Sequence, residues 1–201
     1  MDQTLNELGD PPRPPDGEPL TGGVAVWIFM TVEVVTFGMF LIWHAASWAG
    51  DPEAYAAAQA QLSLNSATIG TALLLTGSLF VALGAQANAA GAQRATAAWL
   101  LAGSLTGVIF TVNKLMEWAP HLNDGVTLST NGFWFTYLFL TQLHLLHVLP
   151  GVGLLAVVAW RAWRGDYGPT NALTVEGSAA YWHLVDVIWL LLFAVLYGMR
   201  P

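Results

Sequence analysis

The sequence GSAAYWHLVDVIWLLLFAVLY occupies residues 177–197, close to the end of the 201-residue chain. It contains one acidic side chain, Asp186, and one imidazole, His183. A helix needs about 20 mainly apolar residues to cross the hydrocarbon core of a bilayer. The stretch therefore predicts a transmembrane helix that carries two ionisable groups within its span.

Four earlier segments have the same character and predict spans at about residues 24–46, 62–87, 95–118 and 131–160. Residues 54–93 contain no charged side chain, but they are too many for one span, since a helix rises about 1.5 Å per residue. We therefore place the Ala- and Gln-rich residues 54–61 at the membrane surface, as a lead-in to the second span. The sequence predicts an all-α fold, an integral membrane bundle of five transmembrane helices.

The composition supports a membrane protein and excludes several other classes. Hydrophobic residues make up 55% of the chain and charged residues 9%, whereas a soluble domain usually carries about 25% charged residues. The net charge of −7 argues against nucleic-acid binding, which needs clustered Lys and Arg. The absence of cysteine excludes disulfides, iron–sulfur clusters and thiolate metal sites.

Residues 1–20 form an acidic, Pro-rich region that we expect to be a mostly disordered cytoplasmic tail, ahead of a five-helix transmembrane domain at residues 21–201. Basic residues favour the cytoplasmic side of a membrane. The tail and the second and fourth loops share one side, which holds four arginines: Arg13, Arg94, Arg161 and Arg164. We therefore expect the N-terminus in the cytoplasm and the C-terminus outside a bacterial-type inner membrane.

Aromatic side chains lie near several predicted span ends. Trp and Tyr are enriched at the two membrane–water interfaces. We expect two aromatic belts, one at the outer interface formed by Trp43, Trp48, Trp118, Trp134 and Tyr197, and one at the inner interface formed by Trp27, Trp99, Trp160, Trp163 and Trp182.

Five ionisable side chains lie near the middle of the predicted spans and are expected to form buried polar contacts: Glu33, His144, His147, His183 and Asp186. Ionisable groups inside a bilayer are costly and usually indicate function. Three interpretations stay open: a hydrogen-bonded cluster that ties helices together, a metal site, or a proton or ion path. A di-iron bundle typically contains Glu-x-x-His pairs, which this chain lacks, so we expect no metal on it. The depths of Glu33 and His147 predict a contact between them, with His144 as the second candidate partner of Glu33. His183 and Asp186 are expected in a second polar group.

Lys114 and Glu117 lie three residues apart near the predicted outer end of the third span. They are expected to form an interfacial ion pair in which Lys114 extends outward to the headgroup layer. The alternative is a contact with a lipid headgroup or a partner subunit.

Several segments resemble subunit III of the haem-copper oxidases, that is, of cytochrome c and quinol oxidases. YWHLVDVIW at residues 181–189 resembles the signature of the last helix of that family, and LHLLHV at residues 143–148 resembles the paired-histidine motif of the preceding helix. Glu33, followed by Phe37 and Phe40, resembles the buried glutamate of an earlier helix. The chain is similar to the shorter five-helix form, and residues 51–65 and 73–82 are most similar to the branch associated with nitric oxide reductase.

The resemblance implies a non-catalytic accessory subunit that binds no cofactor itself. Its partner would be a larger catalytic membrane subunit that carries haem, with copper or non-haem iron, and that reduces oxygen or nitric oxide. The accessory chain would stabilise this subunit, support proton uptake and bind phospholipid. Two alternatives from other classes are a stand-alone membrane metalloenzyme and a small proton-coupled carrier, both using the intramembrane Glu, His and Asp side chains.

Overall fold

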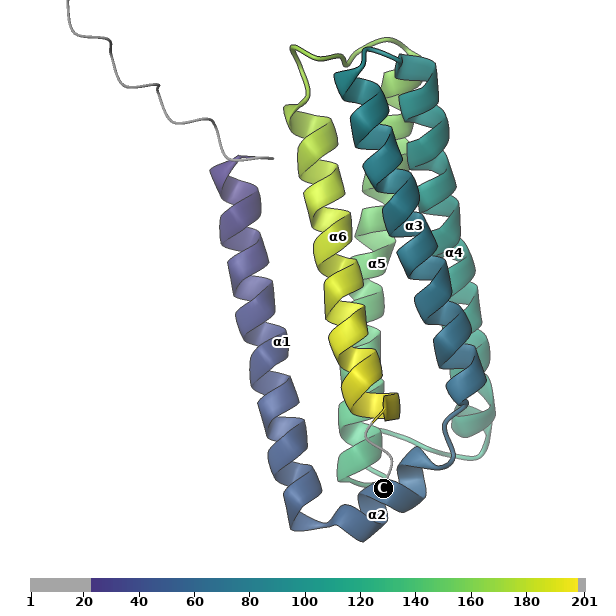
Figure 1. Cartoon of the computed structure of the whole chain (residues 1–201). Coiled ribbons are helices and arrows are strands. Elements are labelled where there is room, and N and C mark those ends of the chain that lie inside the picture. The colour runs from purple at the N-terminus through teal and green to yellow at the C-terminus, as the bar shows by residue number, and fades with distance from the viewer. Residues whose placement is uncertain (1–22, 199–201) are drawn as a thin grey trace, which may run out of the picture.

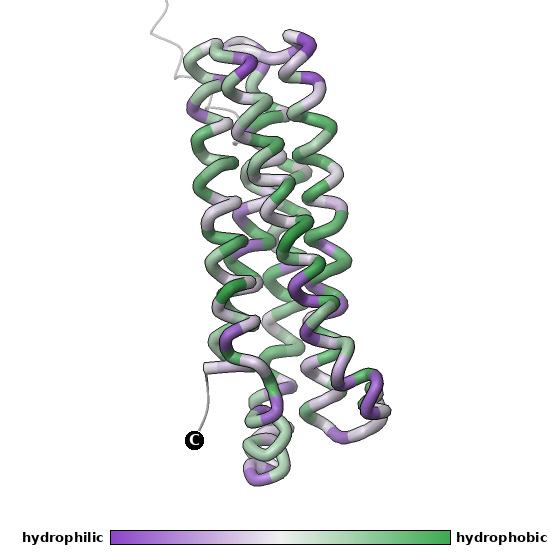
Figure 2. The backbone as a smooth tube through the Cα atoms, turned by 90° about the vertical axis from the view of Figure 1, so that its right-hand side faces the viewer, coloured by the Kyte–Doolittle hydropathy of each residue, from purple (hydrophilic) through white to green (hydrophobic). Residues whose placement is uncertain are grey.

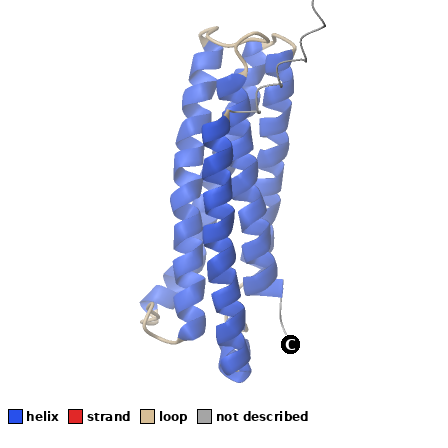
Figure 3. Ribbon diagram, turned by 90° about the vertical axis from the view of Figure 1, so that its left-hand side faces the viewer, coloured by secondary structure: helices blue, strands red, loops and turns tan. Residues whose placement is uncertain are grey.

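The computed structural model describes residues 23–198 and shows a bundle of long, nearly parallel helices (Figure 1). The elements are α1 (Val24–Gly50), α2 (Pro52–Gln59), α3 (Leu64–Ala89), α4 (Gln93–Asn123), α5 (Gly132–Trp163), α6 (Leu173–Phe193) and the π-helical turn η1 (Ala194–Gly198). The described residues contain helices and loops with no strand (Figure 3). The predicted tail at residues 1–20 lies outside the described residues.

Five of these helices are long and apolar enough to cross a membrane, which confirms the predicted all-α membrane bundle. Apolar residues dominate along the bundle, and hydrophilic residues gather mainly at its two ends (Figure 2). Residues 54–61, predicted as a surface lead-in, overlap the short helix α2, which lies at one end of the bundle (Figure 1). Asp51 caps this helix, since its side chain accepts a hydrogen bond from the Ala54 backbone N–H.

The predicted spans fit the helices, apart from their ends. The third span was predicted to stop at residue 118, ahead of Pro120, yet α4 continues to Asn123 with Pro120 inside its last turn. Proline removes only one helical hydrogen bond there, and the turn ends anyway three residues later. At the ends of α3, α4 and α5 the chain turns through a glycine with positive φ; after α3 this is Gly91, and the Ala92 N–H closes the turn by donating to Ala87 O.

α3, α4, α5 and α6 form the tightly packed part of the bundle, and α1 lies along one edge of it (Figure 1). Only 6% of the residues in the apolar window of α1 are buried, against 33–50% for the other four spans. The inward side chains of α1 include Glu33, Phe37 and His44, which recur at helical spacing. The opposite face of α1 exposes an apolar stripe to its surroundings, formed by Ile28, Val32, Val35, Met39 and Ile42.

Small residues let the four packed helices approach one another around the indole ring of Trp182, which is 1% exposed. Gly77, Gly107 and Gly151 come from three different helices, and all three lie against this ring. The belt expectation is wrong for Trp118, Trp134, Trp182 and Tyr197, because these four are buried inside the bundle, whereas the other six residues of the two belts are exposed. The hydrophobic character of the four buried residues was correctly recognised, but their direction around the helix was not.

Gly107→Ala should destabilise the bundle. The added Cβ would lie 2.5 Å from Cη2 of Trp182 and 2.6 Å from a methyl group of Val152, so buried side chains must shift. Overpacking of this kind costs about 1–3 kcal/mol. Gly153→Ala is the matched control on α5, because its Cβ would meet nothing within 4 Å. Unfolding in mixed detergent micelles measures the free energy of unfolding of each variant. Equal stabilities of the two variants would contradict the packing described here.

Candidate functional site

The first polar contact joins α1 to α5. Oε2 of Glu33 lies 3.1 Å from Nε2 of His147, and the two side chains are only 14% and 16% exposed. This confirms the predicted pairing of Glu33 with His147. Phe37 packs edge-on against the same imidazole, with ring centroids 5.7 Å apart. The pair is thus shielded in part by an aromatic side chain from its own helix.

The hydrogen bonds of His147 determine where its protons lie. Nδ1 is 2.7 Å from the carbonyl oxygen of Leu143, and a carbonyl can only accept, so Nδ1 carries a hydrogen. The contact between Nε2 and Glu33 then needs one further proton, on the imidazole or on the carboxyl group. Either arrangement leaves the pair neutral as a whole, which suits a membrane interior.

The second polar contact joins α3 to α6. Oγ of Ser78 lies 2.5 Å from Nδ1 of His183. Asp186 is buried one turn further along α6, and its Oδ1 has no hydrogen-bond partner within the described part of the chain. Sequence reasoning placed His183 and Asp186 in a polar group of their own but missed Ser78, since a serine in a small-residue helix usually indicates packing.

His144 stands apart from both contacts. It is 1% exposed, and neither ring nitrogen has a hydrogen-bond partner among residues 23–198. The rings of Phe110 and Trp189 pack against it, with centroids 5.8 and 5.2 Å away. The five ionisable residues therefore occupy three separate places, and no three His, Asp or Glu side chains of the described chain lie close enough to hold a metal ion. The absence of bound metal stays a prediction.

The third polar contact is a buried network around Lys114 and Glu117. The predicted ion pair is present, with Nζ of Lys114 3.0 Å from Oε2 of Glu117. The expectation that Lys114 extends outward is wrong, because its side chain is 1% exposed and points into the bundle. Two tyrosines that are distant in sequence, Tyr137 and Tyr197, complete the network and could not be identified from local spacing.

Every polar atom at the centre of this network has a partner. Lys114 donates to Glu117 and, over 2.8 Å, to the hydroxyl of Tyr197. Tyr197 and Tyr137 donate in turn to Oε1 of Glu117, over 2.5 and 2.8 Å. Nζ of Lys114 also lies 4.6 Å from the centre of the Trp189 ring, a cation–π contact. The network joins α4, α5, α6 and η1, so it ties together the C-terminal part of the bundle.

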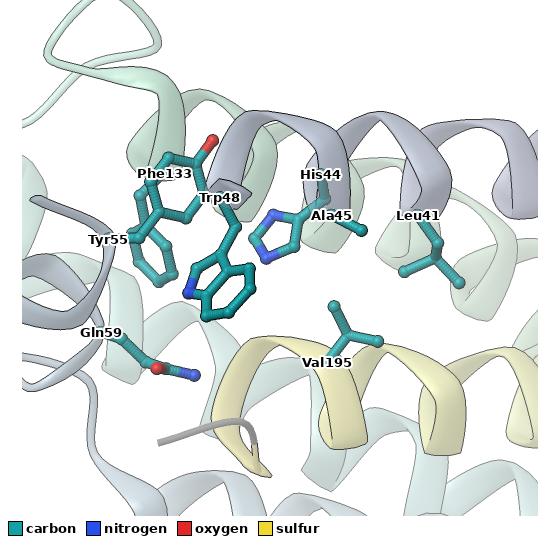
Figure 4. Close-up of a pocket in the computed structure, with 8 residues that line it drawn as sticks. All are labelled: Leu41, His44, Ala45, Trp48, Tyr55, Gln59, Phe133 and Val195. Carbon is teal, nitrogen blue, oxygen red and sulfur yellow. The ribbon is translucent and has the colours of Figure 1, made fainter. Parts of the chain in front are cut away.

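A small, largely enclosed cavity lies where α1, α2, α5 and η1 meet (Figure 4). Its volume is about 60 Å³, and its lining is mainly apolar. His44 lines it and is bonded through Nδ1 to Oγ1 of Thr136, 2.9 Å away. Gln59, on another wall, donates to the carbonyl oxygen of Leu196. The first bond joins α1 to α5 and the second joins α2 to η1, which gives the polar residues of this cavity a structural role.

The fold and these contacts define a multi-pass membrane protein whose intramembrane polar groups bind mostly to one another. Its sequence matches the family of cytochrome c oxidase subunit III over residues 20–199. It is 32% identical to cytochrome c oxidase subunit 3 of Synechocystis, over 90% of this chain and 77% of the relative. It is 24% identical to quinol oxidase subunit 3 of Bacillus subtilis, over 96% of each chain. The chain therefore belongs to the cytochrome c oxidase subunit III family, as the motifs predicted.

Removing one member of the buried ion pair should be more harmful than removing both. Glu117→Leu leaves the Lys114 ammonium without its counter-charge inside the bundle, which costs about 3–5 kcal/mol in comparable cases. The double variant Lys114→Met with Glu117→Leu should recover part of that loss. Unfolding free energies in detergent micelles measure both.

The exposed pair of Arg161 and Asp166 provides the control, because Nε and Oδ2 are 3.2 Å apart but the side chains are 48% and 37% exposed. Asp166→Asn should cost about 0–1 kcal/mol. If Glu117→Leu costs no more than Asp166→Asn, the buried network does not stabilise the bundle.

Proposed function

We propose that this chain is a non-catalytic accessory subunit of a haem-copper respiratory reductase. The observation that carries the proposal is the family match across residues 20–199, which covers all five spans. The relatives are named as third subunits of cytochrome c and quinol oxidases. The partner would be the larger catalytic membrane subunit, and it would carry the haem, with copper or non-haem iron.

The geometry of the chain agrees with a supporting role. Glu33 and His147 satisfy each other, and Lys114 and Glu117 satisfy each other with two tyrosines. A catalytic site instead needs polar groups that converge on a pocket with capacity left for a substrate. The polar groups of this bundle hold helices together, so we assign its contribution to the stability of the complex and to its supply of protons. The reaction would be the reduction of oxygen, which the names of the relatives favour, or of nitric oxide.

A second part of the proposal concerns bound phospholipid. An apolar groove of about 470 Å³ runs between α1 and α6. Phe29 and Val26 line it on one side, and Leu173 and Tyr181 on the other. A groove with this lining suits an acyl chain, because the surrounding solvent is itself hydrocarbon. We propose that a phospholipid tail occupies it in the complex.

We place the complex in a bacterial-type inner membrane, with the N-terminus of this chain in the cytoplasm. Arg94 in the first turn of α4, Arg161 in the last turn of α5 and Arg164 just after it lie at the end of the bundle where α1 begins. Asp51, Glu53 and Asp124 lie at the opposite end. This distribution of basic residues supports the proposed orientation.

Purification of the tagged chain in mild detergent should recover a larger membrane subunit and a haem absorption spectrum. Membranes that lack the chain should retain reductase activity in the first turnovers and lose it faster during sustained turnover, because the catalytic subunit lacks its support. Expression of the wild-type chain in the same cells should restore the time over which reductase activity persists during sustained turnover. Isolation of the chain without a haem protein, with reductase lifetime unchanged by its loss, would refute the proposal.

A further inference from the structure

A groove with polar and apolar walls opens at the end of the bundle where α3 begins and α4 ends. Its volume is about 370 Å³. Met116 and Pro120 contribute to its apolar lining, and its polar lining residues are Gln61, Ser63, Ser66, Asn113, Glu117 and His121. Such a space is wide enough for several water molecules and offers them hydrogen-bonding partners. It lies at the opposite end of the bundle from the apolar groove between α1 and α6.

The walls of this groove are held in place by bonds between α3 and α4. Asn113 donates through Nδ2 to the carbonyl oxygen of Ser66, over 3.0 Å. Oγ of Ser66 donates to Oδ1 of Asn113, over 3.2 Å. This reciprocal pair joins the two helices and presents polar atoms beside the groove.

One face of α4 leads from the groove into the bundle. Lys114, Glu117 and His121 follow one another at spacings of three and four residues, so they share this face and span about 10 Å along the helix. His121 is partly exposed and packs on the ring of Trp134, with centroids 4.8 Å apart. Glu117 lines the groove and bonds to the buried Lys114. Glu117, whose side chain is 1% exposed, is thus the residue shared by the groove wall and the network.

The network can accept or release a proton without a change of fold. A proton on Nζ of Lys114 can move to Oε2 of Glu117 directly, which leaves a neutral amine and a neutral carboxyl group. It can also move through Tyr197, whose hydroxyl accepts from Lys114 and donates its own proton to Oε1 of Glu117. A proton from water in the groove can then bind the neutral amine through the same bonds.

The titratable groups around Glu117 come from three elements. Lys114 and His121 come from its own helix, Tyr137 from α5 and Tyr197 from η1. α3 contributes Ser66 to the groove wall, which does not titrate.

On the inner side the network ends at an aromatic barrier. The ring of Phe110 packs edge-on against Trp189, with centroids 4.8 Å apart, and both rings pack on His144. No hydrogen bond within residues 23–198 reaches either nitrogen of His144. Among the described residues, no hydrogen bond therefore leads from Lys114 past this barrier.

We propose that this groove is a water-filled entrance through which the buried Lys114–Glu117–Tyr197 network exchanges protons with the aqueous phase at this end of the bundle. The network acts as a one-sided proton store, and its ligand is the proton itself. This inference does not depend on the partner or the reaction proposed above. It rests on the groove, on the bonds of the network and on the aromatic barrier behind it.

The lack of cysteine in the chain makes the entrance directly testable. Ser66→Cys places a single thiol in the groove wall. In native membranes it should react with a charged thiosulfonate at least about tenfold faster than two control thiols, because thiols react as thiolates, which need water. Leu79→Cys, 57% exposed on the apolar surface of α3, and Ser104→Cys, buried between α4 and α5, are these controls. If Ser66→Cys reacts no faster than Leu79→Cys, the groove is dry and the proposal fails.

Access to the network itself is measured by infrared spectroscopy during transfer into D₂O. The infrared bands of the Glu117 carboxyl group are those that disappear in Glu117→Gln. In the native chain these bands should shift as soon as D₂O has mixed with the sample. A bulky reagent attached to Ser66→Cys after folding should slow this shift at least about tenfold, if the thiol lies in the water path. The unlabelled Ser66→Cys protein is the matched control. An equally fast shift in the labelled protein, or no shift over hours in the unlabelled one, would overturn the proposal.

Discussion

The absence of water from the hydrocarbon core is the constraint on which the other features of this structure depend. A polar side chain in a membrane span must find its partner within the protein or at an interface. Three contacts meet this demand here: Glu33 with His147, Ser78 with His183, and Lys114 with Glu117. The first two contacts each join two helices. The third lies within α4 but also binds Tyr137 of α5 and Tyr197 of η1. Each contact therefore fixes the position of one helix relative to another. Most of the side chains that look like catalytic groups are thereby used for structure; the exceptions among the described residues are His144 and Oδ1 of Asp186, which have no hydrogen-bond partner.

The contacts divide the bundle into two parts with different packing. α3 to α6 are held by glycine-lined surfaces around Trp182 and by the network of Lys114. α1 has few buried residues, and its inward face meets the rest through Glu33, Phe37 and Phe40, the last of which packs on Phe139 with ring centroids 4.8 Å apart. A loosely packed helix with an apolar outer face suits a subunit that completes its packing against lipid or a larger protein. This arrangement is in keeping with an accessory role.

The sequence predicted how far along its helix each polar side chain lies much better than it predicted which way that side chain points around the helix axis. Span positions follow from hydrophobic length, and the pairing of Glu33 with His147 follows from their similar depth. Direction depends on which helices become neighbours, and local spacing carries little information about this. Lys114 was therefore expected at the surface, although Tyr197, 83 residues away, completes its buried site. Ser78 was missed for the same reason, since its partner His183 is 105 residues distant.

The central claim is that paired polar groups, rather than apolar contacts alone, position the helices, and α1 tests it most directly. Spin labels at Met39→Cys on α1 and Val112→Cys on α4 lie on exposed positions, and the native chain contributes no cysteine of its own. Glu33→Gln retains a hydrogen-bonding group and should keep the narrow distance distribution between the labels. Glu33→Leu leaves Nε2 of His147 without its partner, and the distribution should become clearly broader. An unchanged narrow distribution in Glu33→Leu would contradict the account, because apolar packing alone would then hold α1 in place.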